Sequence, residues 1–340
     1  MGSYPEKTNM LQYLRTKSKV DCDSLDVPLA KELGPFVDST SNQADAYLEL
    51  VLPHRADLFK QSIALAHEIH GEYPGVAFEE LTLEIAMVML GLAIAPYITE
   101  SIHIMTNPTL TSTRTIVENA QRISALTSRI SPSFPLSRVC IKVVSTWEGL
   151  QACRELSALN INTLATTLYT FEQAVLAAEC GCMYIAPFVH ELKAFFDEKY
   201  DDGGANLLLC HEIQQYYRKH EYSTKVKAAG LLSLDEAKAL AGVATMTIAP
   251  DLLRILATTE IEEKDVYRLS LFREDNMIEE KKLERKTYVE DEQGWRQAYA
   301  EAYDGKGQWK TIEAIGVFQE YQLKAERLIL ETERGSRSHD

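Results

Sequence analysis

Four polar side chains lie within or directly after apolar runs that have the character of strands. They are Lys142, Asp23, Glu100 and Thr166. A lysine desolvated by apolar neighbours has a lowered pKa, and its neutral amine can attack a carbonyl carbon to form a Schiff base. Carboxyl and hydroxyl groups nearby can move the protons that this reaction needs. A packed stem with a solvated ammonium is the alternative interpretation of Lys142, and the three companions favour the catalytic one.

Eight short apolar runs provide the elements that would position these groups. They span 18–22, 36–40, 97–105, 139–144, 162–169, 183–189, 225–232 and 246–249. Amphipathic segments at 57–70, 113–126, 147–156 and 171–179 separate several of them and predict helices. Regular alternation of strand and helix predicts a parallel sheet with helices outside, and eight strands predict a closed (β/α)₈ barrel of the TIM type. Reacting groups in such a barrel project from the carboxyl ends of its strands.

The domain prediction is one barrel across residues 1–340, because the sequence shows no internal repeat and no low-complexity linker. Its core would span 18–256, and long helical patterns would form a C-terminal extension at 290–333. The polar tail at 334–340 is expected to be disordered.

Composition excludes several other functions. The formal net charge of −15 argues against non-specific binding to nucleic acid or an anionic membrane. Residues 1–16 have no apolar core of a secretory signal, and the longest apolar stretch, at 85–96, is too short to span a bilayer. Six cysteines without disulfide or zinc spacing indicate reduced thiols in a cytoplasmic protein. His67 and His70 lack further ligands, so no metal site is predicted.

Several motifs match one known family. The segment Ile141-Lys142-Val143-Val144-Ser145-Thr146-Trp147-Glu148-Gly149 resembles the Schiff-base lysine motif of transaldolases. The segments at 38–42, 171–174, 186–189, 211–220 and 247–250 resemble further family motifs in the expected order. The resemblance runs from about residue 20 to 256 and more loosely through the last helix. Transaldolases are (β/α)₈ barrels, which agrees with the strand count.

The resemblance implies a role for each matched residue. Lys142 would form the imine with a ketone, and Asp23, with a slip of one residue, would deprotonate the donor hydroxyl and drive carbon–carbon cleavage. Glu100 and Thr166 would handle protons through a bound water, and Asn42 would orient the substrate. The protonated imine is itself the electron sink, so neither a metal nor an organic cofactor is implied.

The departures from the family pattern all fall on the substrate side. Glu191 replaces a phosphate-binding arginine, and Leu232 stands where a second arginine is expected. Ala186 replaces a serine, Leu164 an asparagine and Gln43 a proline. A carboxylate repels a phosphate, and leucine cannot hydrogen-bond one. The pocket is therefore expected to take a less polar, unphosphorylated substrate.

Weaker signals concern residues beside the matched positions. His190 and His103 are candidates for substrate contact at the barrel mouth. Met105, Tyr169 and Phe171 would form an apolar wall, although packing beneath the helices is the commoner use of such residues.

Three hypotheses follow. The first is a transaldolase-like transferase or lyase of aldol type, acting on a small, non-phosphorylated carbonyl compound in a specialised biosynthetic (secondary metabolite) pathway. The second is an ordinary transaldolase of carbohydrate metabolism, with an arginine such as Arg273 or Arg285 restoring phosphate binding. The third is a non-catalytic barrel that binds a ligand or partner. Transaldolases are often dimers, so a homodimer through the C-terminal helix is compatible with the sequence.

Overall fold

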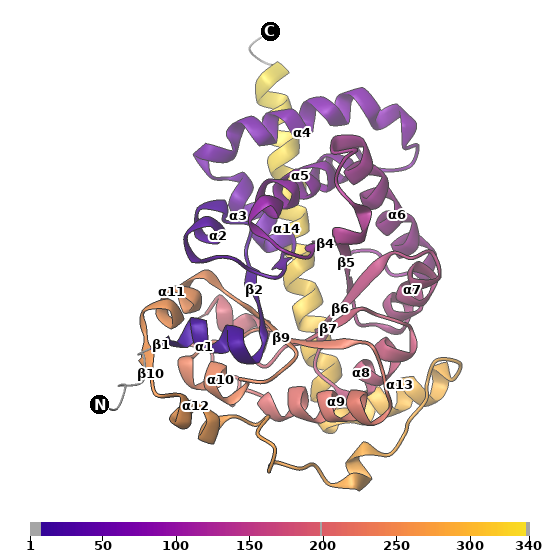
Figure 1. Ribbon diagram of the computed structural model, residues 1–340. Coiled ribbons are helices and arrows are strands. Elements are labelled where there is room, and N and C mark those ends of the chain that lie inside the picture. The colour runs from indigo at the N-terminus through magenta and orange to yellow at the C-terminus, as the bar shows by residue number, and fades with distance from the viewer. Residues whose placement is uncertain (1–7, 198, 338–340) are drawn as a thin grey trace.

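The computed structural model describes residues 8–197 and 199–337, and its centre is a closed barrel of parallel strands (Figure 1). In order around the barrel these are β2 (Lys19–Asp23), β3 (Ser39–Thr40), β4 (Ile102–Met105), β5 (Val139–Val144), β6 (Asn162–Leu168), β7 (Tyr184–Pro187), β8 (Lys225–Ala228) and β9 (Thr245–Ile248). Each predicted run overlaps one of these strands, which confirms the (β/α)₈ architecture. The short strands β1 (Thr8–Asn9) and β10 (Glu260–Ile261) pair outside the barrel.

Helices cover the outside of the barrel. They are α1 (Met10–Lys17), α2 (Val27–Leu33), α3 (Gln43–Leu50), α4 (Ala56–Ile69), α5 (Phe78–Ile94), α6 (Thr113–Ile130), α7 (Trp147–Ala158), α8 (Phe171–Glu179), α9 (Leu207–Lys219), α10 (Leu234–Ala239), α11 (Pro250–Thr258), α12 (Glu263–Leu269), α13 (Glu292–Glu301) and α14 (Lys306–Arg337). None of the helices in the described part of the chain is long and apolar enough to cross a membrane.

Several strands are shorter than the predicted runs, and for two of them the structure shows a local reason. The run at 97–105 begins in a 3₁₀ turn, η3 (Ala95–Tyr97), and β4 starts only at Ile102. A proline at the second position of that turn cannot donate a backbone hydrogen bond to a sheet. The run at 225–232 ends as a strand at Ala228, and Gly230, with a φ of +81°, turns the chain out of the sheet.

The predicted C-terminal helix is α14, which crosses one end of the barrel as the yellow helix of Figure 1. It contacts α3, α5 and β6. The hydroxyl of Thr311 donates to the carbonyl of Thr167 at 3.1 Å, which fixes the helix over the carboxyl end of β6. Residues 334–337 of the tail expected to be disordered belong to this helix, and residues 338–340 lie outside the described residues.

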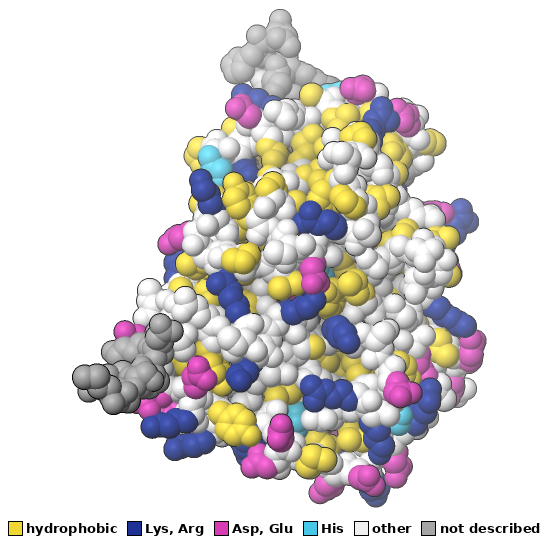
Figure 2. All heavy atoms as spheres, in the orientation of Figure 1, with side chains coloured by type: hydrophobic (Ala, Val, Ile, Leu, Met, Phe, Trp, Pro, Cys, Tyr) yellow, Lys and Arg dark blue, Asp and Glu magenta, His cyan; other side chains and the backbone are white. Residues whose placement is uncertain are grey.

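Charges of both signs are mixed on the visible surface. On the face in Figure 2, lysine and arginine side chains are interspersed with aspartate and glutamate side chains, and no continuous patch of one sign forms.

Candidate active site

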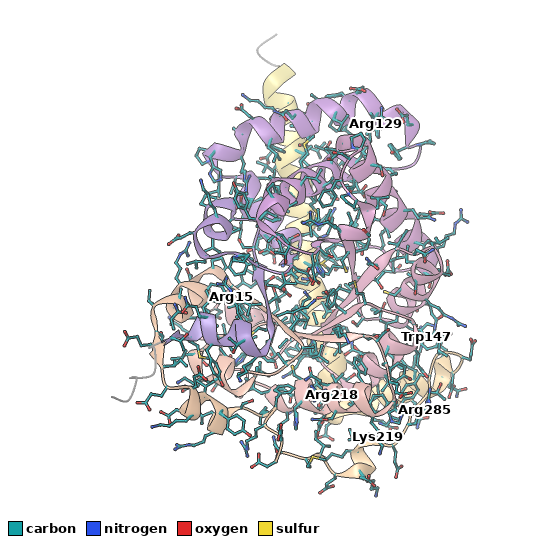
Figure 3. The ribbon with its side chains drawn as sticks, viewed as in Figure 1. Arg15, Arg129, Trp147, Arg218, Lys219 and Arg285 are labelled. Atoms are coloured by element: carbon teal, nitrogen blue, oxygen red, sulfur yellow. The ribbon has the colours of Figure 1, made fainter. Side chains whose placement is uncertain are left out.

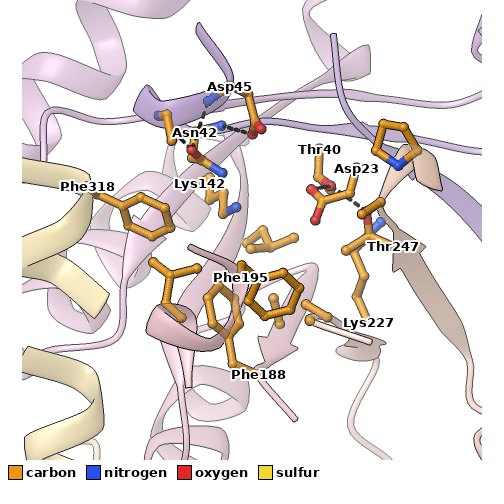
Figure 4. Close-up of a pocket in the computed structure, with 18 of the residues that line it drawn as sticks. Asp23, Thr40, Asn42, Asp45, Lys142, Phe188, Phe195, Lys227, Thr247 and Phe318 are labelled. Atoms are coloured by element: carbon orange, nitrogen blue, oxygen red, sulfur yellow. Dashed lines mark hydrogen bonds between the residues drawn. The ribbon is translucent and has the colours of Figure 1, made fainter. Parts of the chain in front are cut away.

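A pocket opens at the carboxyl ends of the strands and has a volume of about 190 Å³. Its polar lining consists of Asp23, Thr40, Asn42, Asp45, Lys142, Lys227 and Thr247. Its larger apolar lining includes Leu48, Leu164, Phe188, Leu192, Phe195, Phe196 and Phe318. Figure 4 shows Lys142, Asn42 and Asp45 on one side and Asp23, Thr40 and Thr247 on the other. Phe318 comes from α14, so the C-terminal helix supplies part of the wall.

Lys142 is almost completely buried, with 4% of its surface exposed, and its side chain reaches the pocket from the middle of β5. No residue that the structure describes forms a hydrogen bond or ion pair with its amine, and its Nζ atom lies 5.8 Å from the centre of the Phe318 ring. Burial lowers the pKa of Lys142, the nearby charges of Asp23 and Asp45 oppose that change, and Lys227 reinforces it. The net lowering of the pKa favours the neutral, nucleophilic amine.

The segment after Lys142 holds β5 against the helix that follows it. The hydroxyl of Thr146 accepts the backbone N–H of Gly149 at 3.1 Å and begins α7. A Cβ atom on Gly149 would lie 2.0 Å from the carbonyl oxygen of Val144, so only glycine allows this close approach. Thr146 and Gly149 of the S-T-W-E-G motif are therefore needed for the close packing of β5 against α7, besides the link of the motif to Lys142.

Asp23 belongs to a polar cluster formed by the ends of three adjoining strands. The hydroxyl of Thr40 on β3 donates to the Oδ1 atom of Asp23 at 2.6 Å. The same hydroxyl is in close contact with the hydroxyl of Thr247 on β9. This cluster presents a carboxylate and two hydroxyls to the pocket, opposite the amine of Lys142.

Asn42 and Asp45 form a capping box at the start of α3. The side-chain oxygen of Asn42 accepts the backbone N–H groups of Ala44 and Asp45, and the Oδ2 atom of Asp45 accepts the N–H of Asn42 at 3.0 Å. Burial, reinforced by the charge of Asp23, raises the pKa of Asp45 to about 8. The pocket thus contains a carboxyl group that is protonated at neutral pH.

A second lysine, Lys227, lies deeper in the barrel and differs from Lys142 in its partners. Its ammonium donates to Asp21 and, at 2.7 Å, to Asp38. Asp38 also contacts the Nε2 atom of His103 at 3.1 Å. Burial opposes a charged amine here, but the two aspartates outweigh it and raise the pKa of Lys227. Lys227 is therefore a charged structural residue, and Lys142 is the lysine available for nucleophilic attack.

The structure brings five of the predicted site residues together. Lys142, Asp23, Asn42, Leu164 and Ala186 all line the pocket. Leu164 pairs in register with Lys142, so two of these side chains lie beside each other on β5 and β6.

Thr166 follows Leu164 by two residues on β6 and is fully buried, but it does not line the pocket. Its hydroxyl has no hydrogen-bond partner in the described part of the chain.

Glu100 was predicted to handle protons beside Lys142, and its position in the structure is different. It precedes β4, at the amino-terminal end of the barrel, where it forms a 2.6 Å ion pair with Lys19 at the start of β2. Its side chain is 41% exposed. The β4 residue in register with Lys142 is Met105, a buried and apolar side chain. Because β4 begins at Ile102, five residues after the start of the predicted run, Glu100 cannot reach the carboxyl end of the barrel.

Two predicted substrate contacts, Gln43 and Leu232, lie outside the pocket. Gln43 is the buried first residue of α3, and its amide donates to the carbonyl of Thr106 at 3.0 Å. Leu232 is 44% exposed, because the chain leaves the sheet at Gly230, and it is Gly230 that lines the pocket instead.

His190 and Glu191 are likewise absent from the pocket lining and have partners of their own. The Nδ1 atom of His190 lies 2.8 Å from Asp202, and its Nε2 atom lies 3.2 Å from Glu236. Glu191 accepts the hydroxyl of Tyr200 and forms a 3.1 Å ion pair with Lys310 of α14. Both residues therefore hold loops together at the mouth.

The sequence interpretation did not assign a role to Asp45, Lys227, Thr40 or Thr247. Lys227 lies between Val226 and Ala228, which is the same signal that identified Lys142. Asp45 lies three residues after Asn42, a spacing typical of a capping box, but no helix was predicted there.

Arg273 and Arg285, the two arginines that were candidates for restoring phosphate binding, do not line the pocket. None of the described residues that line the pocket is an arginine. Arg273 forms a 2.7 Å ion pair with Asp275. Figure 3 places Arg285 on the outside of the barrel, near Arg218 and Lys219. In the described part of the chain, no group of three or more histidine, cysteine, aspartate or glutamate side chains is arranged to hold a metal ion.

Comparison with known proteins identifies relatives along most of the chain. Residues 20–302 match the family described as transaldolase/fructose-6-phosphate aldolase. A transaldolase of Yersinia pseudotuberculosis serotype IB (strain PB1/+) is 33% identical over 273 residues, covering 76% of this chain and 83% of that protein. Transaldolase 1 of Pectobacterium atrosepticum is 29% identical over 73% of this chain and 79% of its own length. Transaldolase NQM1 of Saccharomyces cerevisiae is 37% identical over 48% of this chain and 49% of its own length.

The family match and these identities agree with the closed eight-stranded barrel and with the lysine motif on β5. The chain belongs to the transaldolase/fructose-6-phosphate aldolase family of enzymes.

Proposed function

We propose that this enzyme forms a Schiff base between Lys142 and a ketone or aldehyde, and makes or breaks a carbon–carbon bond in a substrate that is unphosphorylated and less polar than a sugar phosphate. The observation that carries the proposal is the state of Lys142, whose buried amine lies at the pocket and has no hydrogen-bond or ion-pair partner among the described residues. A desolvated lysine of lowered pKa is the nucleophile that imine formation requires.

The bond-making steps can be followed through the lining residues. The lone pair of the Lys142 amine attacks the carbonyl carbon, and loss of water from the resulting carbinolamine gives a protonated imine. In the cleavage direction, Asp23 accepts the proton of a substrate hydroxyl, the electron pair of that O–H bond forms a new carbonyl, and the adjacent carbon–carbon bond breaks. Its electrons move into the imine and give an enamine, so the imine is the electron sink. Condensation is the reverse sequence.

The chemistry of the lining supports an unphosphorylated substrate. Phosphate recognition relies on arginines or on lysines without other partners, and the described lining offers only Lys142 and the doubly paired Lys227. Asp23 and, when ionised, Asp45 would repel a dianion. Four phenylalanines, Phe188, Phe195, Phe196 and Phe318, give the pocket an apolar aromatic wall instead. A specialised biosynthetic reaction fits such a pocket.

Reductive trapping tests the Schiff base. The protein is incubated with hydroxyacetone or with an aryl-substituted ketone, reduced with cyanoborohydride, and its intact mass is measured. A covalent adduct that is absent from Lys142→Ala and still present in Lys227→Met supports the proposal. An adduct that persists in Lys142→Ala, or the lack of any adduct with either ketone, contradicts it.

An ordinary transaldolase is the second candidate, and the names of the relatives favour it. Transfer of a three-carbon unit from fructose 6-phosphate to erythrose 4-phosphate separates the two candidates. Robust turnover of these sugar phosphates would contradict the unphosphorylated substrate and leave the Schiff base intact.

We further propose that the protein acts in the cytoplasm. All six cysteines are free and buried, which suits a compartment that keeps thiols reduced.

A further inference from the structure

Formation of an imine needs a proton donor close to the lysine. The hydroxyl of the carbinolamine leaves as water, and without an acid it would leave as hydroxide. The neighbour of Lys142 on β4 is Met105, which cannot donate a proton. Glu100 is paired with Lys19 at the opposite end of the barrel, and Thr166 does not line the pocket. The carboxyl groups in the described lining are those of Asp23 and Asp45.

These two carboxyl groups differ in their surroundings. Asp23 accepts the hydroxyl of Thr40 at 2.6 Å within the cluster opposite Lys142. Asp45 lies on the same side of the pocket as Lys142 in Figure 4, at the first turn of α3. Its Oδ2 atom accepts the N–H of Asn42, and no described residue hydrogen-bonds its Oδ1 atom. One oxygen is therefore fixed by the capping box and the other is available to a substrate or a water.

We propose that Asp45 is the acid and base that handles protons during imine formation and hydrolysis at Lys142, an inference that rests on the proposed Schiff-base function. The proton on the Asp45 carboxyl passes to the hydroxyl oxygen of the carbinolamine. The carbon–oxygen bond breaks, water departs, and the nitrogen lone pair forms the C=N⁺ bond. In hydrolysis the Asp45 carboxylate takes a proton from the attacking water. The exchange with substrate is direct or passes through one bridging water.

The electrostatics agree with this role. At neutral pH a carboxyl group with a pKa of about 8 keeps its proton, as a general acid must. The charge of Asp23 contributes to that raised pKa, so the two carboxyls influence each other. Asp23 can then act as the base toward the substrate hydroxyl while Asp45 acts as the acid.

A purely structural role for Asp45 in the capping box makes different predictions. In Asp45→Asn the side-chain oxygen can still accept the N–H of Asn42, so the variant preserves the cap. It replaces the acidic carboxyl group by an amide, which cannot donate a proton to the substrate. Glu84 offers a matched control. Burial raises the pKa of its carboxyl group to about 7, as burial does for Asp45, but Glu84 pairs with Arg122 and Asn119 away from the pocket.

The experiment measures the rate at which hydroxyacetone is trapped on the protein by cyanoborohydride between pH 6 and 9, in the wild type, Asp45→Asn and Glu84→Gln. The wild-type rate is expected to rise as Lys142 loses its proton and to fall near pH 8 as Asp45 loses its own. Asp45→Asn should be slower by on the order of 10²-fold and should lack that fall, while Glu84→Gln keeps the wild-type profile.

Equal rates and profiles in the wild type and a folded Asp45→Asn overturn the inference and leave the Schiff base standing. If Asp45→Asn fails to fold, the wild-type profile decides, because a trapping rate that does not fall above pH 8 also overturns it. A wild type that gives no adduct, or an adduct that survives Lys142→Ala, overturns the proposed function and this inference together.

Discussion

Lys227 and Asp38 form a completely buried ion pair inside the barrel, with 2.7 Å between the Nζ atom and the Oδ2 atom. Asp21 holds the same ammonium from β2. Lys142 reaches the same cavity, and no described residue holds its amine in this way. The barrel thus carries two buried lysines in different surroundings: two aspartates compensate the charge of Lys227, and burial lowers the pKa of Lys142.

Removing the charge of Lys227 should destabilise the fold. Lys227→Met leaves Asp21 and Asp38 buried without a cation, and breaking a buried pair in this way costs about 3–5 kcal/mol. Lys225→Met, at the exposed first residue of the same strand, should change stability by less than about 0.5 kcal/mol. Urea denaturation measures both, and equal stabilities for the two variants would contradict a compensating role for Lys227.

Asp45 should make stability depend on pH. Its pKa is about 8 in the folded state and about 3.9 in an unfolded chain, so the folded protein holds this proton across a range in which the unfolded chain has released it. The wild type should therefore lose stability relative to Asp45→Asn as the pH rises from 4 to 8, and the difference should level off above that. The measurement is the urea midpoint at each pH. A difference that does not change with pH would mean that the Asp45 pKa is not raised.

The close approach at Gly149 should tolerate no side chain. In Gly149→Ala the new methyl group would lie 2.0 Å from the Val144 carbonyl, so β5 and α7 must separate and the protein should lose several kcal/mol. Gly316→Ala, on an exposed face of α14 with open space around it, should instead gain about 0.5–1 kcal/mol. Thermal denaturation of the pair tests the contrast, and a neutral Gly149→Ala would refute it.

The aromatic wall should recognise the apolar part of a substrate. Phe195, in the 3₁₀ turn η5 (Leu192–Phe195), lines the pocket. Because burying an aromatic group contributes about 1.5–3 kcal/mol, Phe195→Ala should raise the KM of an aryl ketone by roughly 10-fold or more. Hydroxyacetone, which has no such group, is the control substrate and should keep its KM. Equal changes for both ketones would indicate a displaced loop rather than a lost contact.

The barrel was predictable from the sequence because buried parallel strands are short apolar runs separated by helical patterns. The place of Lys142 in the pocket was predictable because the segment around it resembles a known lysine motif, whereas the apolar run alone favoured a packed stem with a solvated ammonium. The same reasoning was wrong for Glu100, since an apolar run does not reveal where its strand starts. The first residue of that run belongs to the 3₁₀ turn at 95–97, and β4 begins only at Ile102. Glu100 therefore lies at the amino-terminal end of the barrel.

The remaining differences arise in loops and short helices. A single glycine of positive φ, Gly230, turned Leu232 to the surface. Asp45 escaped notice because α3 is only eight residues long, and because the other residues that line the pocket with it come from distant parts of the sequence. Pocket residues that are defined by contacts between remote parts of a chain leave little periodic signal in the sequence.

The position of Phe318 on α14 has a consequence for biosynthesis of the protein. The ribosome makes the eight barrel strands before it reaches residue 249, yet one wall of the pocket arrives only with the last helix. A nascent chain that closed its barrel before α14 was made would lack the Phe318 side chain beside the Lys142 amine. The pocket wall is therefore complete only when translation is nearly finished.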